Sequence, residues 1–412
     1  MDKQVSMSVE YSMNHAGIRL LEEENGIMRQ LSDRTADFTD SVIRRMTRVS
    51  NKYGAVNLSQ GFPDFDPPRA ILDRLKEVAD ENVHQYSITW GAQNIREALA
   101  GKESRYMGFS IDPNSEIVIT CGSTEAMMAS MMTICNPGDK VAIFSPFYEN
   151  YGADTILSGA KPIYIPLVPP DFHFDANVLE QAFKDGAKAL VLCNPSNPSG
   201  KVFTRDELLA ISEIVKRYDA YVVTDEVYEH IVYDPYEMVY IAALPGMRER
   251  TICCGSLSKT YSITGWRLGY TIAPAEITDR IKKVHDFLTV GAAAPLQEAV
   301  IPGLKFGQDY YDELKATYTH KRDLFCDGLA AAGLRFSRPQ GAYYVMVDIS
   351  EWGCESDLDF CYRLAEKVGV GAVPGSSFFH EPVNHLIRFH FAKKDETLRE
   401  ALDRLQSIHE KM

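Results

Sequence analysis

The chain has 412 residues, of which 45% are apolar and 24% charged, and this composition is typical of a globular protein large enough for two domains. Its 43 basic and 57 acidic residues give a net charge of −14, which argues against nucleic acid as the main partner, because phosphate backbones bind clustered Lys and Arg. The sequence has no apolar run long enough to span a membrane. The eight cysteines show neither zinc spacing nor a Cys-x-x-Cys pair, so we expect buried free thiols such as Cys135 and Cys193 and no metal site. Free thiols are typical of a reducing compartment, and we therefore expect a cytoplasmic location.

The N-terminal part of the chain predicts an arm followed by a helix. Residues 1–37 are polar and only weakly periodic, so we expect them to extend from the folded core. Thr39 or Asp40 is placed to cap a helix whose apolar face carries Val42, Met46 and Val49.

Short apolar runs then alternate with longer amphipathic stretches. The predicted strands are 116–120, 140–144, 163–165, 187–192, 220–224 and 251–254, and the predicted helices between them are 123–135, 176–183 and 205–218. Such alternation indicates a mostly parallel sheet covered on both faces. Ligands of these sheets bind at the carboxyl ends of the strands, where most polar motifs of this chain lie.

After about residue 305 the pattern changes to a mixture of helices and alternating strands. A long charged helix is expected at 308–329, a strand at 341–348, a helix at 358–368 and a strand at 386–392 before a last helix. We therefore predict an α/β fold with a large domain at residues 76–304, and a smaller α+β domain made of 38–75 and 305–412.

Lys259 follows a predicted buried strand, among hydroxyl residues and glycines. Desolvation at such a place lowers the pKa of an amine and makes it a nucleophile. Ser256 and Arg267 lie close to it in the sequence and are suited to hold a phosphate, the arginine through a charge-assisted fork. The alternative is a surface loop with an ordinary lysine and arginine.

Two further motifs follow strands. Asp225 ends an apolar run, where a carboxylate could pair with a protonated pyridine nitrogen, and Tyr228 could reach the phenolic oxygen of the same ring. Asn197 lies in a loop with two Asn-Pro pairs, where its amide could contact both that oxygen and a substrate carboxylate. A helix-capping aspartate and a plain turn are the alternatives.

The remaining candidates are weaker when taken singly. Ser123 and Thr124 begin a predicted helix, whose N-terminus attracts anions. Tyr148 could stack on a pyridine ring, and Tyr86 could donate a phenol to a phosphate. Arg388 lies in a largely apolar strand, where it needs an anionic partner such as a substrate carboxylate or a buried acid. Core packing or a structural salt bridge would also account for the last three.

Together these motifs resemble the class I/II aminotransferases, which are fold-type I enzymes dependent on pyridoxal 5′-phosphate (PLP). The resemblance rests on the order of the motifs from about Phe38 onward: the turn at 122, Asn-Pro-x-Asn-Pro-Ser-Gly, Asp-x-x-Tyr, and Ser-x-Ser-Lys with Arg eight residues after the lysine. The segment Asn57 to Phe65 is similar to the branch that holds kynurenine/glutamine and many bacterial aspartate aminotransferases.

The resemblance implies a role for each matching residue. Lys259 would form the Schiff base with PLP and move a proton, Asp225 would pair with the ring nitrogen, and Tyr228 and Asn197 would contact the ring oxygen. The phosphate would be held by Ser123, Thr124, Ser256 and Arg267, with Tyr148 stacked on the ring. Tyr86 would reach the phosphate of a neighbouring subunit, which implies a homodimer with shared sites. Arg388 would bind the substrate α-carboxylate, and Gly61 would lend a backbone N–H.

The expected activity is ping-pong transfer of an amino group between an L-amino acid and a 2-oxo acid, with aspartate or a neutral or aromatic amino acid as donor. A β-lyase or an amino-acid oxidase would keep the same cofactor residues, so both stay open at this point. The lead-in before Phe38 is too short for the DNA-binding module of a transcription regulator, and the intact Lys259 motif argues against a non-catalytic scaffold.

Overall fold

The computed structural model describes residues 31–36, 38 and 40–412. The predicted arm at 1–37 therefore lies almost wholly outside the described residues, apart from a short 3₁₀ turn at Asp33–Thr35. Residues Met1–Phe38 and Thr39–Met412 form separate units, and the second contains every helix and strand that follows.

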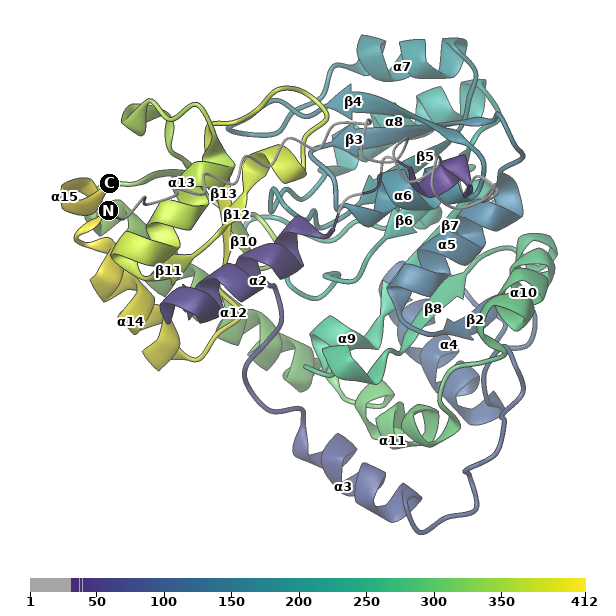
Figure 1. The fold of residues 1–412 in the computed structure, drawn as a ribbon. Coiled ribbons are helices and arrows are strands. Elements are labelled where there is room, and N and C mark those ends of the chain that lie inside the picture. The colour runs from purple at the N-terminus through teal and green to yellow at the C-terminus, as the bar shows by residue number, and fades with distance from the viewer. Residues whose placement is uncertain (1–30, 37, 39) are drawn as a thin grey trace, which may run out of the picture. The chain divides into compact units, whose positions relative to one another are not determined.

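A seven-stranded sheet forms the centre of the second unit (Figure 1). Its strand order is β2-β8-β7-β6-β5-β3-β4, and only β8 runs antiparallel to its neighbours. The strands are β2 (Ile117–Thr120), β3 (Lys140–Ser145), β4 (Lys161–Pro166), β5 (Ala187–Cys193), β6 (Tyr221–Asp225), β7 (Thr251–Ser256) and β8 (Gly269–Ile272). The predicted mostly parallel sheet is confirmed, although the sequence analysis did not predict β8.

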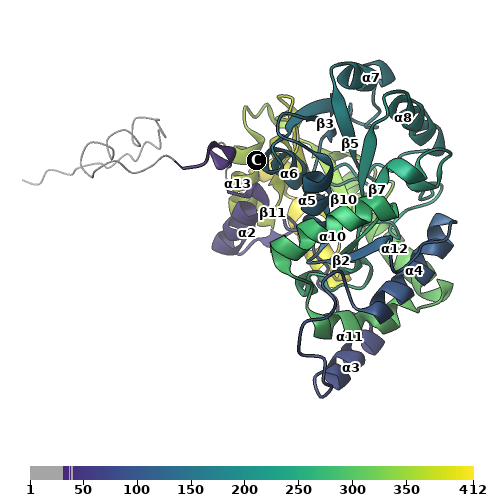
Figure 2. The same cartoon turned by 90° about the vertical axis from the view of Figure 1, so that its right-hand side faces the viewer.

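Helices cover both faces of this sheet because successive strand residues point to opposite sides. Val141 and Ile143 of β3 pack on the face covered by α5 and α6, whereas Ala142 and Phe144 pack on the face covered by α7 and α8. Figures 1 and 2 show α5 and α10 together on one side of the sheet. The helices of this part are α3 (Arg69–Val78), α4 (Gln93–Met107), α5 (Ser123–Ile134), α6 (Asn150–Leu157), α7 (Ala176–Lys184), α8 (Arg205–Arg217), α9 (Leu257–Thr260), α10 (Ala275–Thr289) and α11 (Ala294–Leu304).

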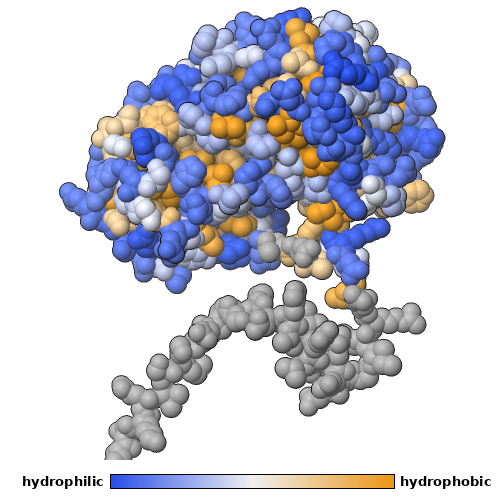
Figure 3. All heavy atoms as spheres, turned by 90° about the horizontal axis from the view of Figure 1, so that it is seen from above, coloured by the Kyte–Doolittle hydropathy of each residue, from blue (hydrophilic) through white to orange (hydrophobic). Residues whose placement is uncertain are grey.

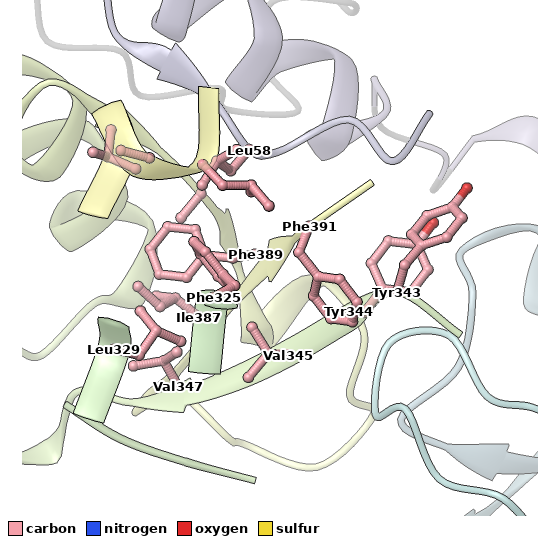
Figure 4. Packing of buried hydrophobic residues seen from close by; sticks show 14 of the residues in the cluster. Leu58, Phe325, Leu329, Tyr343, Tyr344, Val345, Val347, Ile387, Phe389 and Phe391 are labelled. Atoms are coloured by element: carbon pink, nitrogen blue, oxygen red, sulfur yellow. The ribbon is translucent and has the colours of Figure 1, made fainter. Parts of the chain in front are cut away.

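A second sheet has four antiparallel strands in the order β12-β13-β10-β9. Phe325 and Leu329 of the long helix α12 pack against Val345, Ile387 and neighbouring side chains of this sheet (Figure 4). Its strands are β9 (Arg335–Ser337), β10 (Tyr344–Asp348), β12 (Val373–Pro374) and β13 (Leu386–His390), with β1 (Val56–Asn57) paired to β11 (Val370–Gly371) alongside. The helices are α2 (Val42–Tyr53), α12 (Gln308–Ala331), α13 (Asp357–Arg363) with a π-helical turn at Leu364–Val368, α14 (Asp395–Leu405) and α15 (Ile408–Lys411).

The cores around the two sheets share residues across the predicted domain boundaries. Val227 and Ile231, which follow β6, belong to the core of the four-stranded sheet, whereas Met346 of β10 joins the core around Phe144. The boundaries at residues 38, 76 and 305 stay predictions.

Helix α2 is capped by Ser41, one residue after Asp40, the later of the two predicted caps. The Ser41 hydroxyl accepts the hydrogen bond from the Arg44 N–H at 3.5 Å, and the helix ends at Gly54, whose φ of 60° suits glycine. The prediction of Asp40 as the cap is therefore wrong, and Thr39 lies outside the described residues. Met46 and Val49 are buried as predicted.

All eight cysteines are free. Cys135 is buried as expected, whereas Cys193 at the end of β5 is only half-buried, with its thiol donating to the Pro195 carbonyl at 3.4 Å. No described helix combines the length and apolarity that a membrane crossing requires. On the face drawn in Figure 3, apolar side chains form small groups among hydrophilic ones.

Candidate active site

A cavity of about 600 Å³ lies at the carboxyl edge of the seven-stranded sheet. The strand ends bring residues from distant parts of the sequence together there, because parallel strands all end at one edge. The pocket is lined by Ser123 and Thr124 after β2, Tyr148 after β3, Asn197 after β5, Asp225 and Tyr228 at and after β6, Ser256, Lys259 and Arg267 around β7 and β8, and Gly61 and Arg388.

Lys259 lies in α9, immediately after β7. Its amine donates to the Gly61 carbonyl at 3.4 Å, and within the described residues no carboxylate lies within 4 Å of it. Burial lowers the pKa of this amine to about 8. The charge of Asp225 opposes the fall, and the nearby Arg267 and Arg388 add to it. A larger fraction of this amine than of an ordinary lysine is therefore uncharged near neutral pH, and the uncharged state is the one that a nucleophilic amine requires.

Asp225 is the last residue of β6 and is buried. Its Oδ2 accepts a hydrogen bond from the Tyr151 hydroxyl at 2.6 Å, and its Oδ1 accepts one from the Val227 N–H at 3.3 Å. Burial raises the pKa of this carboxyl group, while these two donors and Lys259 oppose the rise. The arrangement fixes the carboxylate at the floor of the pocket, where it can pair with a cationic ring nitrogen.

Arg388 projects from β13 and is 1% exposed. Its Nη1 donates to Asn197 Oδ1 at 2.8 Å and its Nη2 to the Ser59 carbonyl at 2.9 Å, so both partners are neutral. The guanidinium lies 4.4 Å from the centre of the Tyr344 ring, and its Nε has no partner in the described part of the chain. A buried cation of this kind requires an anion, and a carboxylate in the pocket would supply it.

The opposite end of the pocket is formed by the start of α5 and by Arg267. Gly122 precedes the helix with a φ of 81°, and a side chain there would lie 2.3 Å from Arg267 Nη2. Ser256 accepts from the Ser258 N–H at 3.0 Å, and its hydroxyl donates to the Leu268 carbonyl at 3.2 Å. The helix N-terminus and the guanidinium together suit a phosphate.

The remaining predicted residues divide into two groups. Tyr148, Tyr228, Asn197 and Gly61 line the pocket. Tyr86 does not, because it lies in a loop before α4 with 88% of its surface exposed. The structure of one chain therefore brings together every predicted site residue except Tyr86.

Two tyrosines at the site were missed by the sequence analysis. Tyr151 holds Asp225, and the Tyr344 hydroxyl lies 2.8 Å from that of Tyr228. Tyr151 falls three residues after Tyr148, and the turn that begins α6 brings their ring centres to 6.0 Å, so this spacing was a signal that the sequence did carry. Tyr344 belongs to a predicted strand far along the chain, and no local pattern indicated its contact with Tyr228.

The comparisons with known proteins agree with this geometry. Residues 53–405 match the family model described as aminotransferase class I and II. The chain is 36% identical over 369 residues to a methionine aminotransferase of Escherichia coli (89% of this chain, 96% of the relative), and 33% identical over 417 residues to a kynurenine–oxoglutarate transaminase of Dictyostelium discoideum (92% and 96%). A solved structure of the E. coli protein YbdL, for which a methionine aminotransferase function is reported, superposes with a TM-score of 0.89 at 34% identity, covering 93% of this chain and all of that one.

Proposed function

The chain belongs to the class I and II aminotransferases, a PLP-dependent family, and from this premise we propose that it binds PLP through Lys259 and transfers amino groups in the pocket described above. The observation that carries the proposal is the joint placement of Lys259, Asp225 and Arg388 around one cavity. The reaction converts an L-amino acid to its 2-oxo acid and then aminates a second 2-oxo acid at the same site.

The residues present fit the cofactor. A phosphate would be held by the N–H groups of Ser123 and Thr124 and by Arg267, with Ser256 beside them. The glycine at position 122 supports this placement, because a side chain there would occupy the space next to the guanidinium. Asp225 would lie against the ring nitrogen, Tyr148 on the ring face, and Tyr228 and Asn197 near the ring oxygen.

PLP, when bound, supplies the electron sink that makes the Cα proton of an amino acid acidic. The chain supplies the groups that move and hold protons. Lys259 Nζ would remove the proton from the substrate Cα, which its pKa of about 8 favours near neutral pH. Asp225, held by Tyr151, would keep a proton on the ring nitrogen.

Arg388 would bind the α-carboxylate of the amino acid or oxo acid. Its two neutral acceptors fix the plane of the guanidinium without neutralising it. Because Asn197 accepts from Arg388 through its oxygen, its NH₂ group stays available to donate into the pocket. Substrate orientation therefore depends on a residue of β13 and one of the β5 loop.

We propose a neutral or aromatic L-amino acid as the donor. The named relatives act on methionine and kynurenine, and the pocket lining includes the apolar residues Ile43 and Phe62. The same relatives are aminotransferases, which argues against the β-lyase and oxidase alternatives. The proposal also includes a cytoplasmic homodimer, in which Tyr86 reaches the phosphate in the site of the other subunit.

The proposal is tested by titrating the purified holoenzyme with single L-amino acids and following its visible absorbance. We expect methionine, kynurenine or another neutral or aromatic amino acid to bleach the band of the bound cofactor, and a 2-oxo acid to restore it. Lys259→Ala should lose both the covalently attached cofactor and turnover. Preferential bleaching by aspartate would contradict the donor class, and release of ammonia or consumption of oxygen would contradict transamination.

A further inference from the structure

We propose that Tyr344 is a positioning residue that orients the Tyr228 hydroxyl toward the ring oxygen of the cofactor. The inference rests on the proposed function, because it concerns the cofactor that Lys259 would carry. It assigns a role in the reaction to a residue that none of the sequence motifs contains.

The two phenols form one buried pair. Tyr344 begins β10, Tyr228 follows β6, and their hydroxyl oxygens are 2.8 Å apart, with each residue 3% exposed. Both line the pocket. Figure 4 shows the Tyr343 and Tyr344 rings at one end of the core cluster, with their hydroxyl oxygens directed away from Leu329.

The loop opposite accommodates the Tyr344 hydroxyl closely. A Cβ atom at Gly61 would lie 2.3 Å from this oxygen, so the glycine leaves the space that the phenol occupies. The Gly61 carbonyl accepts from Tyr343 at 3.1 Å and from Lys259 at 3.4 Å, which holds the loop in place. The Tyr344 hydroxyl therefore has a defined position beside the pocket.

Either hydroxyl of the pair can donate to the other, and an anionic ring oxygen beside Tyr228 would favour Tyr344 as the donor. Burial raises the pKa of both Tyr228 and Tyr344, so both keep their protons at neutral pH. A hydroxyl rotates to suit its surroundings, and Tyr228 can donate only one proton. If Tyr344 donates to the Tyr228 oxygen, the Tyr228 proton is free for an anionic ring oxygen, and the two bonds strengthen each other.

Tyr344→Phe removes this donor and keeps the ring. A weaker Tyr228 donor leaves more negative charge on the ring oxygen, which holds a proton on the cofactor-linked Lys259 nitrogen more tightly. We expect the pKa of the visible transition of the holoenzyme to rise by about 0.5–1 unit, the size expected for one net hydrogen bond. The measurement is a spectrophotometric pH titration without substrate, so it does not depend on turnover.

Tyr318→Phe is the matched control. Tyr318 is buried in the same core, its ring stacks on Tyr343 at 5.7 Å, and its hydroxyl has no partner among the described residues. This variant loses the same atom from the same core, so we expect its spectral pKa to equal that of the unmodified enzyme. A shift as large as that of Tyr344→Phe would indicate a general loosening of the core and would overturn the proposal.

A double-mutant cycle separates the two contacts of Tyr344, whose ring also lies against Arg388. In a Tyr228→Phe background, Tyr344→Phe should leave the spectral pKa unchanged, because the hydroxyl that it orients is gone. An undiminished shift in that background, or none in the single variant, would overturn the assignment. A protein without any cofactor band would instead contradict the proposed function itself.

Discussion

The Lys259 side chain is half-buried, and among the described residues the only hydrogen-bond partner of its amine is the Gly61 carbonyl. Lys102 provides the contrast within the same chain, because it is more deeply buried, at 2% exposed, and contacts the carboxylates of Glu103 and Glu229 at 2.6 and 2.7 Å. Burial and these two charges act oppositely on Lys102, and its pKa stays above the ordinary value. Carboxylate partners therefore keep Lys102 a permanent cation, whereas Lys259, which lacks a carboxylate in contact, can act as a nucleophile.

The first prediction concerns the pH dependence of cofactor uptake. The neutral amine is the reactive form, so the rate of holoenzyme formation from apoenzyme and added PLP should rise with pH and level off above about 8. The rate falls at lower pH because a pH below this pKa protonates the amine and removes the nucleophile. Stopped-flow absorbance over pH 6–10 measures it. A rate that still climbs tenfold per unit at pH 9–10 would show an ordinary lysine.

Most of the residues that the sequence identified lie shortly after a strand or interrupt an apolar one. Asp225, Lys259 and Arg388 stand out in this way because a charge in an apolar segment requires an explanation. Tyr151 and Tyr344 do not stand out, since tyrosine is common in cores and its role depends on a hydroxyl partner from another element. Pairings of this kind are decided by tertiary packing.

At the scale of elements, a buried ionic network connects helix α4 to the turn that carries Tyr228. Glu229 accepts from Lys102 of α4 and, at 2.6 Å, from the Tyr240 hydroxyl, while Tyr270 of β8 donates to Glu103 at 2.9 Å. The Tyr270 ring passes Gly255, where a Cβ atom would lie 2.2 Å from it. The contacts of Glu229 with Lys102 and Tyr240 thereby hold the turn after β6 in place.

The second prediction is that Lys102→Met strongly destabilises the protein. The substitution would leave Glu103 and Glu229 buried without their cation, which costs about 3–5 kcal/mol of unfolding free energy. Urea denaturation of the apoenzyme measures this change. The matched control is Lys76→Met, which breaks an exposed pair with Asp73 and should cost under about 1 kcal/mol. Equal effects of the two variants would contradict the structural role of the network.

The elements themselves were predicted unevenly. The strands at 140–144 and 251–254 were found because they are continuous apolar runs, and in the structure each extends by one or two residues. β8 was not predicted, because its four residues, which include Gly269 and Thr271, are too few and too weakly apolar to indicate a strand. Its place between β2 and β7 depends on pairing with all four residues of β2 and with the last four residues of β7.

At the scale of the whole molecule, the exposed Tyr86 belongs to a group of exposed apolar side chains. The loop of Tyr86 and Ile88 is joined to the end of α10 by the hydrogen bond between His285 and the Thr89 carbonyl, and Phe287 at that end is 91% exposed. Large apolar residues grouped on a surface are typical of protein–protein contacts. This arrangement supports the proposed homodimer.

The third prediction tests the shared site. Tyr86→Phe should weaken PLP retention about fivefold to tenfold without changing the fold, since it removes one hydroxyl donor to a phosphate. Dialysis against buffer without cofactor, followed by absorbance, measures retention. Phe287→Glu should shift the sedimentation coefficient toward that of a monomer and reduce retention as well. A fully active monomer that retains PLP would contradict the sharing.

The overall architecture was the most predictable level, because alternating strands and helices leave few ways to build a sheet. The division into domains was harder to predict from the sequence. Val227 and Ile231 pack with the four-stranded sheet although their segment belongs to the other one, and no periodicity within residues 226–231 indicates which core they join.

The antiparallel course of β8 has a consequence for redesigning the chain. Residues 257–268 form the whole connection between β7 and β8, and this connection contains both Lys259 and Arg267. A single residue inserted between Lys259 and Arg267 would therefore change the distance between their side chains. The turns after α7 and α8, at residues 185–186 and 218–219, contribute nothing to the pocket lining. New chain ends made at those turns by circular permutation should preserve the site, whereas grafted loops will be tolerated least within the twelve residues of that connection.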